Sequence, residues 1–120
     1  MYNDLVMNLT VEELERRVAT TKRKLAKVGE LRPGVLTEQY NVCGKAGCRC
    51  KANPPQRHGP YLQLGWTRNG KSTTRFVRRE ELATVRKQIK NYARLQELVQ
   101  QWVDLSLELC ELRRAEARAK

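Results

Sequence analysis

The sequence predicts an α+β protein with an N-terminal helix, a small antiparallel β module containing an Asn-Gly hairpin, and a long C-terminal helix with coiled-coil-like packing. Apolar residues recur at steps of three and four near both ends of the chain, whereas the middle alternates and is rich in Gly and Pro. We therefore expect three segments: an N-terminal helical arm over residues 1–33, a β module over residues 34–78 and a long helix over residues 79–120.

The N-terminal helix has a start signal and a stop signal. Thr10 and Glu13 are spaced as a capping box, in which each side chain accepts from the other residue's backbone N–H. A narrow apolar seam follows, with one threonine in a gap, and consists of Val11, Leu14, Val18, Thr21, Leu25 and Val28. Gly29 is a candidate for the left-handed residue that ends the helix, and Pro33 and Gly34 prevent its continuation.

The middle of the chain contains a hairpin signal. Residues 61–67 and 72–77 alternate between apolar and polar side chains and flank Asn69 and Gly70, which suit the positive φ angles of a type I′ turn. The register that this turn imposes pairs Leu62 with Val77, Trp66 with Thr73, and Gln63 with Phe76. Residues 35–42 are expected to form a further short strand.

The C-terminal helix carries a continuous apolar stripe without Gly or Pro. Its members are Leu82, Val85, Ile89, Tyr92, Leu95, Leu98, Trp102, Leu105, Leu109 and Leu112. Forty residues in a helix span about 60 Å, so the stripe must pack against the first helix, a second copy of the chain, or both. The first helix covers only part of it. The remainder, around Trp102 to Leu112, is expected to leave an apolar strip exposed in a monomer. We therefore predict an interface for a homodimer or a larger partner protein, formed by Leu95, Leu98, Trp102, Leu105, Leu109 and Leu112.

Three cysteines and the only histidine of the chain fall within sixteen residues, in the pattern C-x4-C-x-C-x7-H. The predicted ligands of a structural Zn²⁺ are Cys43, Cys48, Cys50 and His58. Gly44 and Gly47 lie between the first two cysteines, where a tightly curved backbone would bring the sulfurs together. An ion would also supply the stability that an isolated hairpin lacks.

Other interpretations of these cysteines remain open. The three could be buried thiols beside a surface histidine, or Cys48 and Cys50 could form a redox pair. The fourth cysteine, Cys110, lies on the apolar stripe of the long helix, where we expect it to pack as a small hydrophobe; whether it contributes to the metal site stays undecided.

The net charge of +11 is concentrated in the middle third of the chain. Residues 41–79 hold nine basic side chains and no acidic one, while residues 1–40 and 80–120 each carry a net charge of +1. The predicted phosphate contacts are Lys45, Arg49, Lys51, Arg57, Arg68, Lys71, Arg75, Arg78 and Arg79. We expect nucleic acid as the partner, with DNA favoured over RNA, although such a cluster can also be a solvated surface.

The aromatic residues of the β module have two interpretations. Tyr61, Trp66 and Phe76 could stack on unpaired bases, but a small module needs such side chains for its core, and we expect the core role. The sequence does not predict an enzyme: it offers no Ser-His-Asp set and no phosphate-binding Gly loop, and residues 41–79 contain no carboxylate to act as a base beside a catalytic zinc.

The composition favours a cytoplasmic protein without a membrane segment. No stretch approaches the ~18–20 apolar residues of a membrane span, and the first ten residues do not resemble a signal peptide. Cytoplasmic thiols stay reduced, which favours metal ligands over disulfides.

Three sequence runs together resemble a family of small bacterial proteins. These runs are GVLTEQYNVCGKAGCRC, RHGPYLQL and GKSTTRFV, followed by a long helix, and the resemblance covers about residues 34–112. Members carry CGKxxCxC and HGPY motifs and have no established biochemical function, but they are often found with transposases. The resemblance therefore implies a mobile-element setting. One departure is Leu62, where the family pattern has a second aromatic after HGPY.

Two functional hypotheses follow from these features. The first is a zinc-stabilised, basic nucleic-acid-binding accessory protein of a mobile element. The second is an adaptor that docks a partner enzyme through the long helix.

Overall fold

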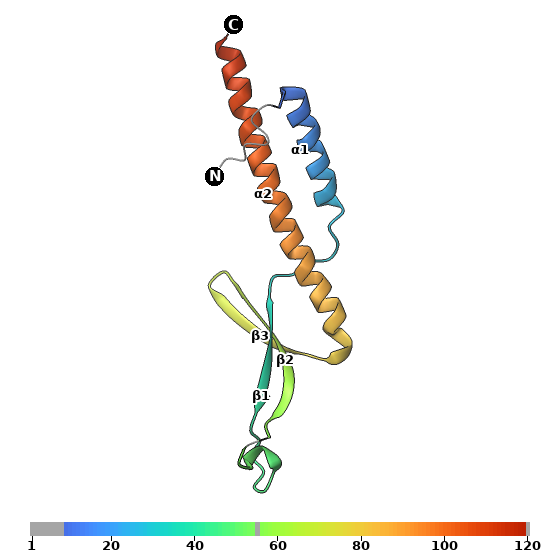
Figure 1. Ribbon diagram of the computed structural model, residues 1–120, viewed down its shortest axis with the longest axis vertical. Helices are drawn as coiled ribbons and strands as arrows, with labels where there is room; N and C mark the ends of the chain where they lie inside the picture. The colour runs from blue at the N-terminus through green and yellow to red at the C-terminus, as the bar shows by residue number, and fades with distance from the viewer. Residues whose placement is uncertain (1–8, 55, 120) are drawn as a thin grey trace. The chain divides into compact units, whose positions relative to one another are not determined.

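The computed structural model describes residues 9–54 and 56–119, and it has the predicted α+β composition (Figure 1). The expectation about a signal peptide concerns residues that mostly lie outside this description. The elements in chain order are α1 (Val11–Ala26), β1 (Val35–Asn41), the 3-10 turn η2 (Arg49–Lys51), β2 (His58–Arg68), β3 (Lys71–Val77), the 3-10 turn η3 (Arg79–Glu81) and α2 (Leu82–Arg118).

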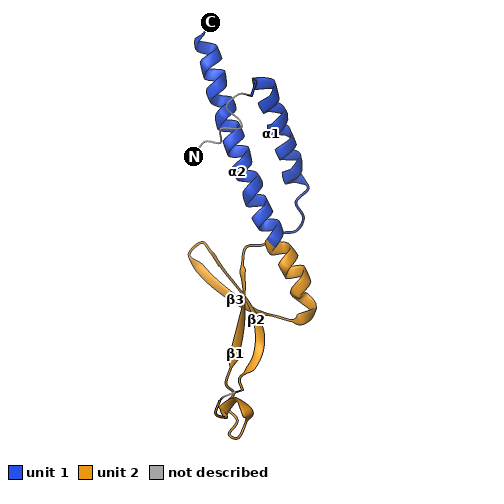
Figure 2. Ribbon diagram, viewed as in Figure 1, with its two compact units in different colours: residues 1–31, 90–120 blue, residues 32–89 orange. Residues whose placement is uncertain are grey.

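The chain divides into two compact units (Figure 2). Residues 1–31 and 90–120 form one, which we call the helical unit; residues 32–89 form the other, which we call the sheet unit. The sheet unit is an insertion between two parts of the helical unit. The helix α2 begins in the sheet unit and continues into the helical unit.

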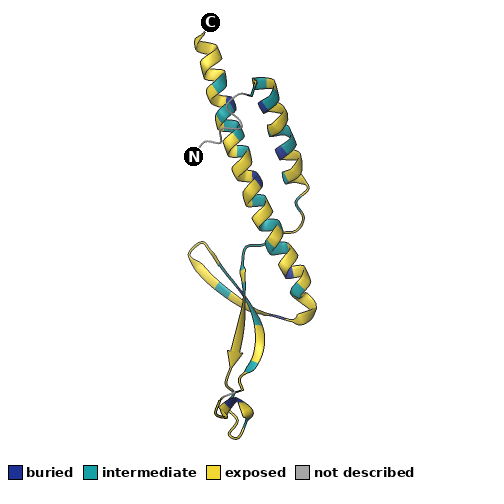
Figure 3. Ribbon diagram, in the orientation of Figure 1, coloured by how far each residue is buried: buried dark blue, intermediate teal, exposed yellow. Residues whose placement is uncertain are grey.

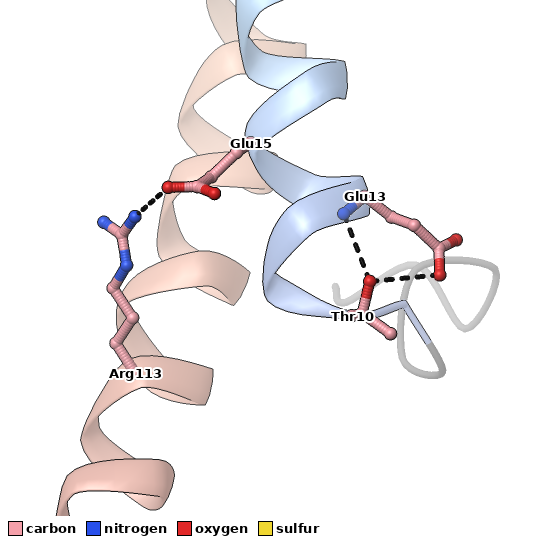
Figure 4. A network of polar contacts seen from close by, with 4 residues as sticks. All are labelled: Thr10, Glu13, Glu15 and Arg113. Atoms are coloured by element: carbon pink, nitrogen blue, oxygen red, sulfur yellow. Dashed lines mark hydrogen bonds and ion pairs between the residues drawn. The ribbon is translucent and has the colours of Figure 1, made fainter.

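Within the helical unit, α1 lies antiparallel beside α2 (Figure 1). Three contacts show the antiparallel direction: Glu15 with Arg113, Lys22 with Trp102, and the Glu30 carbonyl with Asn91. The residue numbers of the partners in α2 fall as those of the N-terminal residues rise. The Lys22 ammonium lies 5.2 Å from the centre of the Trp102 ring, and the Asn91 amide donates to the Glu30 carbonyl at 2.7 Å. The ion pair between Glu15 and Arg113 is shown in Figure 4.

The predicted stripe of α2 is confirmed, since each of its ten members is buried or half-buried. In the helical unit Leu14 and Leu98 are fully buried, and Leu109 is 8% exposed. The expectation of an exposed strip from Trp102 to Leu112 is therefore wrong. The reason is that α1 packs along this part of α2, as the contacts of Lys22 and Arg113 show.

The start of α1 follows the prediction more closely than its end. The Glu13 backbone N–H donates to the Thr10 hydroxyl at 3.2 Å, and that hydroxyl donates to the Glu13 carboxylate at 3.1 Å, where we had expected the Thr10 N–H as donor (Figure 4). The helix ends at Ala26, with Lys27 as its cap. Gly29 is not the left-handed cap: tight bonds from the N–H groups of Lys27 and Val28, each to the carbonyl three residues earlier, satisfy the last turn instead.

The sheet unit contains a three-stranded antiparallel sheet in the order β1-β2-β3. Its hairpin register is the predicted one, with Leu62 opposite Val77 and Gln63 opposite Phe76. Asn69 and Gly70 have φ angles of 53° and 75°, as a type I′ turn requires. The strand β1 pairs with β2 from Val35, and the register shifts near Gln39.

The core of the sheet unit is small. Leu64, Val77 and Val85 are buried, and Leu36, Leu62, Trp66 and Ile89 pack around them. This core joins one face of the sheet to the first turns of α2, while most of the surrounding sheet residues are exposed or half-buried (Figure 3). Three buried side chains are a small core for a unit that spans residues 32–89.

Candidate metal centre

The four predicted ligands converge. One donor atom from each of Cys43, Cys48, Cys50 and His58 lies within 4.8 Å of every other. The Sγ atoms of Cys43 and Cys50 are 3.5 Å apart, and Sγ of Cys48 is 3.2 Å from Nε2 of His58. Two sulfurs bound to one zinc at ~2.3 Å in a tetrahedron are ~3.8 Å apart, so the cluster has the dimensions of a Cys3His site.

Three short elements position these side chains. Cys43 follows the end of β1, Cys50 lies inside the turn η2, and His58 is the first residue of β2. The turn is closed by the Lys51 N–H, which donates to the Cys48 carbonyl at 2.9 Å. His58 pairs with Asn41 of β1 beyond the register shift, so the sheet itself brings the imidazole near the thiols.

Two glycines make this geometry possible. Gly47, before Cys48, has a φ angle of 81°, in the left-handed region that other residues seldom adopt. Gly59, after His58, has a φ angle of 135°, and a Cβ there would lie 2.6 Å from the Gln39 carbonyl oxygen. The glycine of the HGPY motif is thus needed for close approach to β1. The expectation for Gly44 is not supported, since its φ angle is not positive and open space surrounds the position of a Cβ.

The thiols differ in their acidity. The pKa of Cys48 is lowered from 9.0 to about 6. The largest cause is a hydrogen bond from the Cys50 backbone N–H, and hydrogen bonds with the thiols of Cys43 and Cys50 add to it. Burial raises the pKa of Cys50, which is 1% exposed and accepts a hydrogen bond from the Cys43 N–H at 3.4 Å. One thiolate is therefore available at neutral pH, and a bound cation would remove the proton from a buried thiol.

All four cysteines are free thiols. Cys110 lies in the helical unit and outside the cluster, and it is exposed on α2, whereas we had expected it to pack. An exposed stripe of α2 lies on its side of the helix, with Val99, Val103 and Leu107 at four-residue steps.

All nine predicted phosphate contacts are exposed. Four flank the metal cluster, namely Lys45, Arg49, Lys51 and Arg57. Arg68 and Lys71 face each other at the tip of the hairpin, and Arg78 and Arg79 follow the end of β3. The sheet thus carries positive charge at both ends of β2, about 33 Å apart for ten residue steps.

Arg75 is arranged differently from the other eight. Its guanidinium lies 5.8 Å from the centre of the Trp66 ring, and that of Arg32 lies 4.6 Å from the same ring. Trp66 also packs on the buried core of the sheet unit, as expected. The contact of Arg32 with this ring could not be predicted, because Arg32 lies outside the basic run of residues 41–79.

A further basic residue was missed. Arg86, on the first turns of α2, lines a hollow of about 380 Å³ together with Arg79, Tyr61, Phe76 and the acidic Glu38. The uninterrupted basic run ends at Arg79, before two glutamates, so the charge count gave no reason to include Arg86.

Comparisons with known proteins give one match. Residues 11–87 match a family described as a domain of unknown function (DUF6788), which is more than half of the chain. Neither the curated proteins nor the solved structures contain a significant match. Among the described residues, no helix is long and apolar enough to cross a membrane.

Proposed function

The chain belongs to this family, and from the chain's own residues we propose that it is a zinc-stabilised, basic nucleic-acid-binding accessory protein. The observation that carries the proposal is the distribution of charge. The sheet unit holds 12 basic and 3 acidic side chains, a net charge of +9. A compact surface with that excess attracts the phosphates of nucleic acid.

The metal has a structural role in this proposal. Four protein ligands would complete a tetrahedron and leave no open position for a substrate or water. Thiolate and imidazole donors favour Zn²⁺ over hard cations, which prefer oxygen ligands. The ion would hold the loop that carries Lys45, Arg49 and Lys51. In this proposal the protein binds nucleic acid and does not catalyse a reaction.

A mobile-element setting is part of the proposal. It is supported by the resemblance of the CGKAGCRC and RHGPY runs to proteins often found with transposases. In that setting we expect DNA as the nucleic acid.

The test is a titration of a labelled 20-base-pair DNA at two salt concentrations. Replacing both hairpin-tip residues, Arg68→Glu with Lys71→Glu, should weaken binding for all sequences and reduce the salt slope by about 1.8, the value for two phosphate contacts. The matched control reverses two exposed residues of α1, Arg16→Glu with Arg17→Glu, which changes the net charge equally. Equal losses in both variants would reject the assignment of the hairpin tip, and a wild type that binds neither this duplex nor a single strand at low salt would reject the proposed function.

A second candidate function has its own supporting observation. Val99, Val103 and Leu107 are 41%, 53% and 53% exposed along one side of α2. Such a stripe suits the helix of a second copy or of a larger partner protein, as an adaptor would need. This function would be favoured by a partner protein that stays bound after nuclease treatment and is lost with Val103→Glu. The protein should then also fail to bind DNA at moderate salt.

A further inference from the structure

The aromatic residues of the sheet unit lie on opposite faces of the sheet. Successive strand residues point to opposite sides, so Leu62, Leu64 and Trp66 face the core. Tyr61 and Phe76 point the other way and are 42% and 68% exposed. The expectation that these two rings fill the core is therefore wrong, because only the face with Trp66 is covered by α2. We call the other face the open face.

The two exposed rings are close neighbours on the open face. Phe76 of β3 lies opposite Gln63 of β2, and Tyr61 precedes Gln63 by two residues on the same strand. This makes the rings a diagonal pair, with Cα atoms about 7–8 Å apart, which is within reach of aromatic side chains. The sheet thus presents two adjacent aromatic rings to solvent.

Uncharged polar groups surround the rings. Among the strand residues that point to the open face, within 35–39, 61–67 and 72–76, none carries a charge. Gly65 leaves a gap in the middle of β2, and a hollow of about 490 Å³ lies there, lined in part by Gln63, Thr67 and Thr74. Its size is typical of small-molecule sites, and amide and hydroxyl groups can bond to the edge of a base.

Cationic groups lie at the end of the open face where the two rings are. Arg79 and Arg86 line the hollow of about 380 Å³ to which Tyr61 and Phe76 also contribute, and Glu38 is the acidic residue in its lining. At the hairpin tip, the alternation places Arg68 and Lys71 on the same side as Trp66. An apolar protein partner has no need of the two guanidinium groups beside the rings. A chain of flat bases joined by phosphates matches both the uncharged strand residues and the arginines at the end of the open face.

We propose that the open face binds single-stranded nucleic acid, with unpaired bases stacked on Phe76 and Tyr61 and phosphates on the bordering arginines. The proposal rests on the proposed nucleic-acid function and specifies unpaired strands as the preferred substrate. A duplex keeps its bases stacked on one another, so it cannot use these rings. Both DNA and RNA strands have the required chemistry.

The experiment compares a labelled 15-nucleotide thymidine strand with a 15-base-pair duplex, each titrated with the full-length, metal-loaded protein. Phe76→Ala should weaken binding of the single strand roughly 5- to 150-fold, the usual effect of losing one base–aromatic stack, and leave duplex binding within about twofold. Phe76→Tyr should keep wild-type affinity because it keeps a ring. A uridine strand tests RNA in the same way.

Phe76→Leu is the decisive control, since leucine keeps apolar bulk but has no aromatic face. Loss of single-strand affinity with Phe76→Leu supports stacking. Unchanged affinity in both Phe76→Ala and Phe76→Leu overturns the open-face proposal, while a loss with the Arg68 and Lys71 reversal would still uphold the proposed function. Self-association that Phe76→Leu retains and Phe76→Ala abolishes, measured by light scattering, would show a protein interface and also overturn the proposal. If the wild type binds neither strand nor duplex, both proposals fail.

Discussion

The helical unit and the sheet unit carry the same number of basic side chains but differ in their acidic ones. Each has 12 Lys and Arg residues, while the helical unit has 10 Asp and Glu residues and the sheet unit has 3. In the helical unit, basic groups pair with carboxylates, as Arg113 does with Glu15 and Arg114 with Glu111. The difference between the units is therefore a deficit of acid in the sheet unit rather than an excess of base.

The units also differ in what stabilises them. The helical unit buries Leu14, Leu98 and Leu109 along a continuous helix pair. The sheet unit buries the smaller side chains of Val77 and Val85 beside Leu64, and its other buried apolar residue, Cys50, belongs to the Cys43–His58 cluster. We infer that side-chain packing stabilises the helical unit and that an ion contributes much of the stability of the sheet unit.

Metal removal should have the largest effect. A structural zinc contributes roughly 10 kcal/mol or more to folding, which exceeds what the small core of the sheet unit can replace. Chelation, or Cys50→Ser, should abolish hydrogen-exchange protection in β2, at Leu64 for example, while the amide of Leu98 in α2 stays protected. Elemental analysis of the untreated protein should give one zinc per chain.

The chain provides a matched control for this result. Cys110→Ser removes an exposed thiol outside the cluster and should change neither metal content nor protection. If the metal-free protein protects the sheet amides as well as the loaded protein does, the contrast between the two units disappears.

A core substitution in the helical unit should have the next largest effect. Leu98 is fully buried, so Leu98→Ala should lower the free energy of unfolding by about 2–5 kcal/mol, measured by denaturant titration at saturating zinc. Val103→Ala, at a position 53% exposed, should cost less than about 0.5 kcal/mol. Metal content should stay at the wild-type level in both; a loss of zinc with Leu98→Ala would mean that the two units are not separately stabilised.

Much of the fold could be predicted from the sequence because its signals are local or periodic. The Asn69–Gly70 turn fixed the hairpin register, and the stripe from Leu82 to Leu112 identified the buried side of α2. Exposure could not be predicted in the same way. Whether the strip from Trp102 to Leu112 is covered depends on where α1 docks, and that is a tertiary contact between residues nearly a hundred positions apart.

The metal cluster was predictable because ligand type and spacing carry the chemistry. The positions of the aromatic residues were not predictable, because Phe76 and Trp66 are both large aromatic residues in predicted strands and only the side covered by α2 separates them. The alternation along β2 did place Tyr61 and Trp66 on opposite faces, but it could not say which face α2 would cover.

The effect of pH on metal binding should be smaller than that of the Leu98 substitution. It should be about 1.4 kcal/mol per pH unit for each thiol that must lose a proton. The folded pKa of Cys48, about 6, lies below its ordinary value of 9.0, so this group stabilises the folded site fully above pH 9 and loses that contribution as the pH falls toward 6. Zinc affinity, measured with a competing chelator, should fall with decreasing pH and fall more steeply below about pH 6, where Cys48 also binds a proton. If the slope of zinc affinity against pH is already steepest between pH 7 and 8, the pKa of Cys48 is the ordinary one. The site would then not be preformed without metal.

The smallest expected effect concerns the ion pair between Glu15 and Arg113, which joins α1 to α2 (Figure 4). Both side chains are about half exposed, so a double-mutant cycle with Glu15→Gln and Arg113→Gln should give a coupling energy of about 0.2–1 kcal/mol. That energy should shrink toward zero in 1 M salt, where the screening length is only about 3 Å. The same salt should remove most nucleic-acid binding by the sheet unit, because there many cations act on one polyanion and counterion release multiplies the effect. A coupling energy above 2 kcal/mol would mean that charge pairing, and not only the leucine seam, stabilises the helical unit.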